Sequence, residues 1–170
     1  MKITPKNSEK VFAENELLVT KTDLKGIITY ANREFMHIVE IDENVLVGAP
    51  HNIIRHPDMP KIIFKYLWSY LQNEEEIHAY VKNICADGSY YWVFANVTPS
   101  YLNEKVVGYH SARRKPTAKA LEVVKPLYEK LLNAEKSGGI NASEKMLNDL
   151  LKEKGVHYGE CKSNCVNLKK

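Results

Sequence analysis

The sequence predicts an α+β domain, with a five-stranded antiparallel sheet whose helices pack on one face and with further helices at the C-terminus. Two observations indicate this fold. Short β-rich runs joined by turn residues lie before residue 33 and after residue 76, and hairpin turns make neighbouring strands antiparallel. The segments between these runs have helical spacing of apolar residues. Strands at both ends with helices grouped between them are typical of an α+β arrangement.

The first hairpin is predicted within residues 15–32. β-rich residues run from Leu18 to Asp23, and a second β-rich run continues to Asn32. Gly26 lies in the connection between them, where a glycine readily adopts positive φ. These features predict two short strands joined by a tight turn.

Two short helices should follow the hairpin. Asn32 is a suitable N-cap for a helix over residues 33–39, and residues 41–48 resemble a second capped turn that ends at Gly48. Both segments are too short to form a helical layer alone.

The segment from Pro50 to Pro60 is the most unusual part of the chain, with three prolines, two histidines, an arginine and an aspartate in a short space. Each proline disfavours a helical residue before it. We therefore predict short turns that shape a polar site. Helical spacing of apolar residues then predicts a helix over residues 61–71, with Pro60 near its first turn.

Three strands should complete the sheet, over residues 77–85, 90–99 and 106–113. The Asp87-Gly88 pair is a strong hairpin signal between the first two. A second turn is predicted over residues 102–105.

The C-terminal part is predicted to be helical, beginning at a cap on Thr117. Pro126 implies that this helix either restarts there or is kinked. A break is expected at Ser137 to Gly139, followed by a short helix. We therefore divide the chain into an N-terminal segment (1–14), a sensor domain (15–115), a C-terminal helix (116–136), and a linker, short helix and tail (137–170).

Composition excludes several classes of function. The chain has 170 residues, 24 of them basic and 21 acidic, so its charge of +3 gives no reason to expect nucleic acid as a partner. The run Arg113 to Lys115 is interpreted as solvated surface. The sequence contains no run of about 18 apolar residues, so it gives no reason to expect membrane insertion. Three cysteines form no disulfide framework, which fits a cytoplasmic protein.

Motifs for enzymatic chemistry are missing from the sequence. There is no phosphate-binding loop, nucleophile elbow or zinc-protease helix, so we do not expect an enzyme. His157, Cys161 and Cys165 have a spacing that could bind a metal, but three residues in a tail are a weak signal.

Several motifs resemble the PAS sensor domain of the aerotaxis receptor (Aer) family and its stand-alone relatives in two-protein energy-taxis systems. The resemblance covers about residues 15–133. Its motifs are Thr22-Asp23-Leu24, Ile28-Thr29, Ala31-Asn32, Gly48-Ala49-Pro50-His51-Asn52, Arg55-His56-Pro57-Asp58-Met59-Pro60-Lys61, Phe64, Trp68, Val81-Lys82-Asn83, Gly88, Tyr91-Trp92-Val93, Ala95-Asn96, Gly108-Tyr109 and Pro126-Leu127-Tyr128.

The resemblance implies a PAS fold that holds FAD noncovalently and reports its redox state in aerotaxis, or energy taxis. The expected partner is a separate HAMP-containing membrane chemoreceptor of the methyl-accepting type, which the protein would contact from the cytoplasm. The C-terminal helices are candidates for docking or for a homodimer, and packing on their own sheet is the equally good alternative.

The candidate cofactor-binding residues suit the chemistry of FAD, whose diphosphate needs a cation and whose ring needs a flat slot with a polar edge. Each also has a structural alternative: helix capping for Asn32, pairing with Asp58 for Arg55, backbone contacts for the histidines, and ordinary core packing for the aromatic residues. The candidates are Asn32, His51, Arg55, His56, Asp58, Trp68, Asn83, Tyr91 and Trp92, with Asp58 orienting Arg55 or His56.

One departure from related flavin sensors keeps two alternatives open. Those sensors commonly have a tryptophan just after the charged helix end, where this chain has residues 76–80, so Tyr80 or His78 would have to replace a wall of the ring site. A PAS domain can instead bind haem through an axial histidine, for which His37, His51, His56 and His78 are candidates. The other alternative is a cofactor-free interaction module whose cavity is filled by Phe64, Trp68 and Tyr91.

Overall fold

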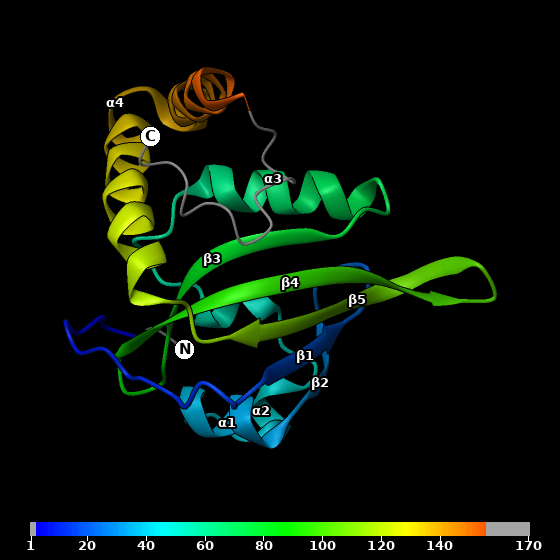
Figure 1. Cartoon of the computed structure of the whole chain (residues 1–170). Coiled ribbons are helices and arrows are strands. Elements are labelled where there is room, and N and C mark those ends of the chain that lie inside the picture. Colours follow the sequence, from blue (N-terminus) through cyan, green and yellow to red (C-terminus); the bar gives the residue numbers. More distant parts are fainter. Residues whose placement is uncertain (1–2, 156–170) are drawn as a thin grey trace.

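The computed structural model describes residues 3–155, which form one antiparallel sheet with helices on both of its faces. The strand order is β2-β1-β5-β4-β3 (Figure 1). The strands are β1 (Leu18–Thr22), β2 (Ile28–Ala31), β3 (Ile77–Ile84), β4 (Tyr90–Leu102) and β5 (Lys105–Arg114). The predicted five-stranded sheet is confirmed. β4 is longer than predicted, because Pro99 remains within it, opposite Tyr109 of β5.

Three short elements and one longer helix separate β2 from β3 in sequence, as predicted. They are α1 (Arg33–Val39), α2 (Glu43–Leu46), the single 3-10 turn η1 (His51–Ile54) and α3 (Lys61–Gln72). The proline-rich segment thus forms short turns, and its extended residues Pro50 and Arg55 flank η1. Ile62, Ile63 and Leu71 of α3 are buried, which fixes α3 above the sheet.

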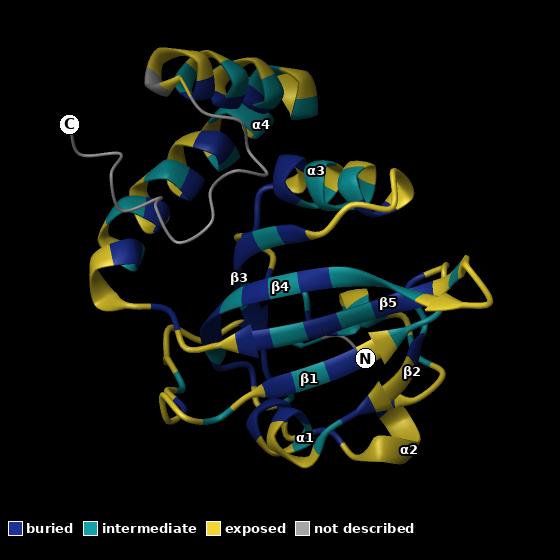
Figure 2. Cartoon of the chain, turned by 45° about the vertical axis from the view of Figure 1, so that its right-hand side comes forward, coloured by how far each residue is buried: buried dark blue, intermediate teal, exposed yellow. Residues whose placement is uncertain are grey.

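The core occupies the space between the sheet and this helical layer. Most residues of β3 are buried and the others are half-buried, and in β5 the exposed residues lie toward the two ends of the strand (Figure 2), as expected for a sheet with helices on both faces. Phe35, Leu46, Ile63 and Val93 are among the fully buried residues of this core. This packing holds the sheet and the helical layer in fixed positions around any space that remains between them.

The N-terminal segment packs on the turn between β3 and β4. The amide of Lys6 donates to the carbonyl of Gly88, and the amide of Lys10 donates to the carbonyl of Tyr90. Phe12 joins the core and meets the ring of Tyr91 edge to face. Residues before the first strand are therefore part of the folded unit.

α4 (Ala118–Lys154) consists of two helical segments that meet at a break. Thr117 caps its start, as predicted, through a bond from the amide of Ala120. Within α4, non-helical backbone angles occur only at Gly138 and Gly139, so the helix passes through Pro126 without restarting. Packing of Val124 and Tyr128 into the core on either side accounts for this continuity.

The break turns the second segment of α4 back across α3 (Figure 1). Glu135, at the end of the first segment, accepts hydrogen bonds from the amides of Lys61 and Ile62. α4 therefore supplies the N-terminal cap of α3 from a distant part of the chain, and carboxylates stabilise helix N-termini. No helix among residues 3–155 is both long and apolar enough to cross a membrane.

Candidate functional site

A cavity of about 290 Å³ lies between the sheet and the helical layer. This is close to the lower end of the range for small-molecule sites. Its wall combines strand residues of the covered face, the β1–β2 turn, η1 and one face of α3. The lining residues are Thr20, Thr22, Lys25, Gly26, Pro50, His51, Asn52, Arg55, Phe64, Leu67, Trp68, Leu71, Val81, Asn83, Ala95, Val97, Tyr109, Ser111 and Arg113.

Four of the candidate residues from the sequence, His51, Arg55, Trp68 and Asn83, line this cavity. The backbones of Arg55 and Asn83 pair as an isolated antiparallel bridge, which places these two residues side by side. Segments far apart in the chain therefore converge on one wall.

Arg55 is fixed in an extended position along that wall. Its guanidinium carbon lies 4.2 Å from the centre of the Phe64 ring, and Nη2 donates to the carbonyl of Met59 at 3.3 Å. Burial lowers the pKa of Arg55, while the charge of Glu135 acts to raise it. Arg55 does not pair with Asp58, which was its structural alternative. It is half-buried, so part of the side chain remains accessible at the cavity.

Trp68 forms part of the apolar wall on α3. Its ring meets Tyr109 of β5 edge to face, with the ring centres 5.8 Å apart. Gly26 lies against the same indole, because a Cβ at this position would come within 3.2 Å of it. A side chain at residue 26 would therefore have to displace the Trp68 ring slightly, and the φ of Gly26, +78°, favours glycine here as well.

Asn32 is a structural cap and does not line the cavity. Its Oδ1 accepts from the amides of Phe35 and Val19, and its Nδ2 donates to Leu17 and Glu34. Every donor and acceptor of the amide is therefore used in joining α1 to β1. In this structure Asn32 thus has the capping role that was its structural alternative, and it lies outside the cavity lining.

His56 and Asp58 also lie outside the cavity wall. His56 is buried against the edge of Tyr90, and its Nδ1 accepts from the amide of Asp58. The Asp58 carboxylate lies 2.7 Å from Nζ of Lys82. Asp58 does contact His56, as predicted, but it ties the loop to β3 and does not reach the cavity.

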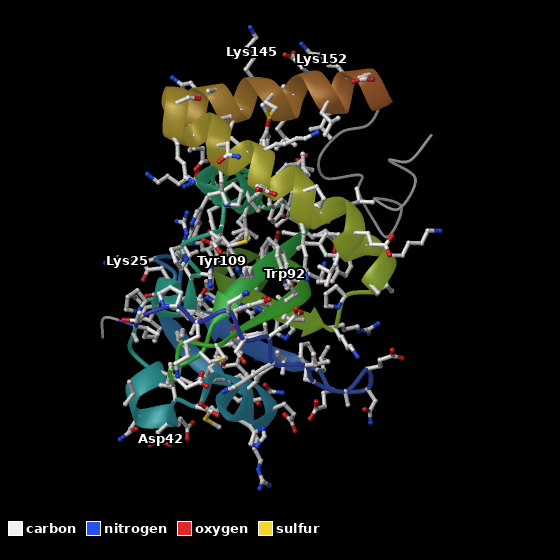
Figure 3. The ribbon with its side chains drawn as sticks, turned by 90° about the vertical axis from the view of Figure 1, so that its left-hand side faces the viewer. Lys25, Asp42, Trp92, Tyr109, Lys145 and Lys152 are labelled. Atoms are coloured by element: carbon white, nitrogen blue, oxygen red, sulfur yellow. The ribbon has the colours of Figure 1, made fainter. Side chains whose placement is uncertain are left out.

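The neighbours Tyr91 and Trp92 point to opposite faces of β4, since side chains alternate along a strand. Trp92 packs against Tyr128 of α4, so it is not a wall of the cavity (Figure 3). Tyr91 shares the covered face with Val93 but is fully buried behind the cavity lining. Neither residue therefore forms the slot wall that was expected.

The replacement for the missing tryptophan is likewise not found in β3. His78 stacks on Phe94, and Tyr80 meets the same ring. Phe94 shares its face of β4 with Trp92, on the side of α4. The cavity wall on the side of α3 is instead made by Phe64, Leu67, Trp68 and Leu71.

Arg113 is the important residue that sequence reasoning missed. It was assigned to solvated surface, but it is only 5% exposed and lines the cavity. A signal was available, because Tyr109, Ser111 and Arg113 share one face of β5 by their spacing of two. The structure brings all three to the cavity.

The side chain of Arg113 is held by His51 and Thr20. Its Nη2 lies 2.7 Å from Nε2 of His51 and donates to Oγ1 of Thr20 at 2.9 Å. Arginine has no acceptor, so Nε2 of His51 must accept, and the proton of the neutral ring is at Nδ1. Burial, followed by the charge of Arg113, lowers the pKa of His51 to about 3.

This arrangement predicts acid lability of the fold. The pKa of His51 is about 6.5 in the unfolded chain and about 3 in the folded one, so the unfolded state binds more protons in that interval. The part of the folding stability that depends on a neutral His51 is therefore fully present above pH 6.5 and is lost as the pH falls below that value. From pH 6.5 to 4.5 we expect the free energy of unfolding to drop by about 2 kcal/mol through His51.

Urea unfolding at several pH values checks this expectation. His56 adds to the slope in the same direction, because burial and the charge of Lys82 lower its pKa to about 4. The variant His51→Asn should keep only the shares of His56, of His110, whose pKa burial also lowers, and of the carboxylates. An equal pH dependence in both proteins would contradict the role given to His51.

The polar lining of the cavity is incompletely satisfied within the chain. Among the described residues that line the cavity, Asn83 Nδ2, Ser111 Oγ and Arg113 Nη1 are buried without a hydrogen bond of good geometry. Asn83 also lies near Tyr91, whose pKa is raised by burial while the Asn83 side chain acts to lower it. A buried polar group without a partner costs roughly 1–3 kcal/mol, so native proteins have few. Three such atoms around one cavity fit a polar ligand.

The charge of the lining is one-sided. Lys25, Arg55 and Arg113 contribute cations, while no aspartate or glutamate is among the lining residues in the described part of the chain. A ligand with negative charge would therefore be favoured. FAD fits this donor set, because its diphosphate is anionic and its ring has an edge of carbonyls and ring nitrogens.

The histidines give little support to haem ligation. Of the four candidates only His51 lines the cavity, and its free nitrogen already accepts from Arg113. His37 is on the exposed side of α1, and His78 is on the far face of β3. Residues 3–155 contain no cluster of three or more potential metal ligands, and the sequence motif of His157, Cys161 and Cys165 lies outside the described residues.

Comparisons with known proteins agree with this architecture. The aerotaxis receptor of Escherichia coli (strain K12) is 41% identical over 122 residues, which are 72% of this chain and 24% of the receptor. The chain thus spans about a quarter of that receptor's length.

Solved structures share the fold at low identity. A light-oxygen-voltage domain described with a flavin analogue has a TM-score of 0.57 at 16% identity, covering 67% of this chain and 86% of its own. The PAS domain of a protein from Colwellia psychrerythraea has a TM-score of 0.54 at 22% identity, covering 59% and 86%. The family model for the PAS fold matches residues 28–113, and the chain therefore belongs to the PAS fold family, with the aerotaxis receptor as a relative.

Proposed function

We propose that this PAS domain binds FAD noncovalently in the cavity and acts as a redox sensor for aerotaxis, or energy taxis. The observation that carries the proposal is the lining of the cavity. The described lining residues include three cations and no aspartate or glutamate, and three of their buried polar atoms lack a hydrogen bond of good geometry. The similarity to an aerotaxis receptor and to a flavin-associated domain supports the same conclusion.

The residues of the cavity divide naturally between the two parts of FAD. Lys25 is exposed and Arg55 is half-buried, so these cations are accessible for the diphosphate. Asn83, Ser111 and Arg113 are buried and would serve the polar edge of the ring. The bound ring would supply reversible electron uptake, while the protein holds it away from water.

α3 is the element best placed to transmit a change from the cavity. Its inner face carries Trp68, while its outer face carries Lys65 and Tyr66, which bind Glu144 and Asn148 of α4 at 2.6 Å each. Glu135 holds the start of the same helix. A shift of the cavity wall would thus reach α4, from which contact with a separate HAMP-containing membrane chemoreceptor would carry the signal.

The absorbance spectrum of the purified protein tests the proposal directly. Maxima near ~450 and ~370 nm, together with FAD among the molecules released by heat, are the expected result, since these are properties of an oxidised flavin. Added FAD should also raise the melting temperature of apoprotein, because a ligand stabilises the state that binds it.

Other outcomes would identify the alternatives. A strong band near ~410 nm would indicate haem and overturn the flavin proposal. A colourless protein whose melting temperature does not change with added FAD would leave the cofactor-free interaction module as the better account.

A further inference from the structure

Arg113 carries a buried positive charge that has no acidic partner in the described part of the chain. Burial lowers its pKa to about 10, which still leaves the guanidinium charged at neutral pH. Leaving a buried cation without an anion is costly, and native proteins normally pair such groups. The missing counter-charge is therefore the feature that needs an explanation.

The groups around Arg113 fix the side chain without neutralising it. Thr20 and the neutral ring of His51 accept from Nη2, and the Phe35 ring lies 5.4 Å from the guanidinium carbon. Tyr91 is near enough to act electrostatically, but burial raises its pKa above the usual value, so its hydroxyl stays neutral. Nη1 has no partner among residues 3–155. The cation is thus held rigidly at the cavity wall with one donor group unused.

We infer that Arg113 favours the reduced, negatively charged form of the bound flavin ring over the oxidised, neutral form. This inference rests on the proposed function. Each electron that the ring takes from a reduced electron carrier without a proton adds one negative charge to it. A fixed cation in a water-poor site interacts more favourably with the negatively charged ring than with the neutral ring. Arg113 would thereby raise the midpoint potential of the flavin.

Thr20 and His51 are positioning residues in this scheme. Both accept from the same nitrogen of Arg113, which orients the planar guanidinium. His51 can do so only while its ring is neutral, and desolvation of the ring together with the charge of Arg113 favours the neutral form by lowering the pKa of His51. Direct contact with the ring is not required of either residue.

The test compares Arg113→Met with Arg114→Met in the full chain loaded with FAD. Arg114 is the next residue and is exposed, so its variant makes the same change of charge on the other face of β5. We expect Arg113→Met to lower the preference for the reduced form at least about tenfold, or about 59 mV per electron. Arg114→Met should leave the potential near that of wild type. Arg113→Lys, which restores a charge, should recover most of the loss.

The readout is a spectroscopic redox titration with dithionite against a reference dye, after FAD occupancy is measured. If Arg113→Met does not fold, Arg113→Gln replaces it, because the amide can still bond to Thr20 and His51. An unchanged potential at full FAD occupancy overturns the inference and leaves FAD binding intact. Failure of the wild-type protein to take up FAD overturns the proposed function, and the inference with it.

Discussion

Replacing Arg55 with alanine is expected to weaken FAD binding at least about a hundredfold, because removing one partner of a buried charge contact typically costs about 2–5 kcal/mol. The guanidinium is held ready by the Phe64 ring and the Met59 carbonyl, so little side-chain entropy is lost on binding an anion. Fluorescence titration of the apoprotein with FAD measures the change in affinity, and circular dichroism checks the fold.

Arg33→Ala is the matched control for Arg55→Ala. Arg33 is an exposed residue of α1 outside the cavity, so its removal lowers the net charge equally without changing the lining. FAD affinity should remain near wild type in this control. Wild-type affinity in Arg55→Ala would instead exclude Arg55 as a contact of the diphosphate.

The elements of the fold could be predicted well because each has a local signal. Asn32 and Thr117 cap the helices that follow them, and Gly138 and Gly139 mark the break in α4. The effect of Pro126 could not be decided locally. Whether a proline interrupts a helix depends on the packing around it, and here buried residues on both sides keep the helix intact.

The site was harder to predict because a strand has two faces, and local sequence does not say which face will be covered. Trp92 and Tyr91 differ by a single position, yet one contacts α4 and the other faces the core. Arg113 belongs to a basic run that suggests surface, but its position on β5 turns it inward. Asn32 illustrates the opposite case, where an amide suited to a ligand is used entirely in joining α1 to β1.

Gly108→Ala should cause the largest loss of stability, at least about 3 kcal/mol, which is the upper part of the range for overpacking. A Cβ at residue 108 would overlap the carbonyl oxygen of Thr22, which belongs to the neighbouring strand β1. Both positions are backbone, so neither can rotate away, and the strands would have to separate. Urea unfolding measures the effect.

Gly48→Ala separates this clash from ordinary glycine strain. Gly48 has a φ of +88°, but no atom lies within 4 Å of the place that an alanine Cβ would occupy, so only the backbone conformation should cost, about 1 kcal/mol. An equal loss in both variants would show that β5 yields freely at Gly108. Because Thr22 lines the cavity, separating the strands at Gly108 should also lower FAD affinity, whereas Gly48→Ala should not. Both the stability of the fold and the shape of the cavity would then depend on the close packing of β5 on β1.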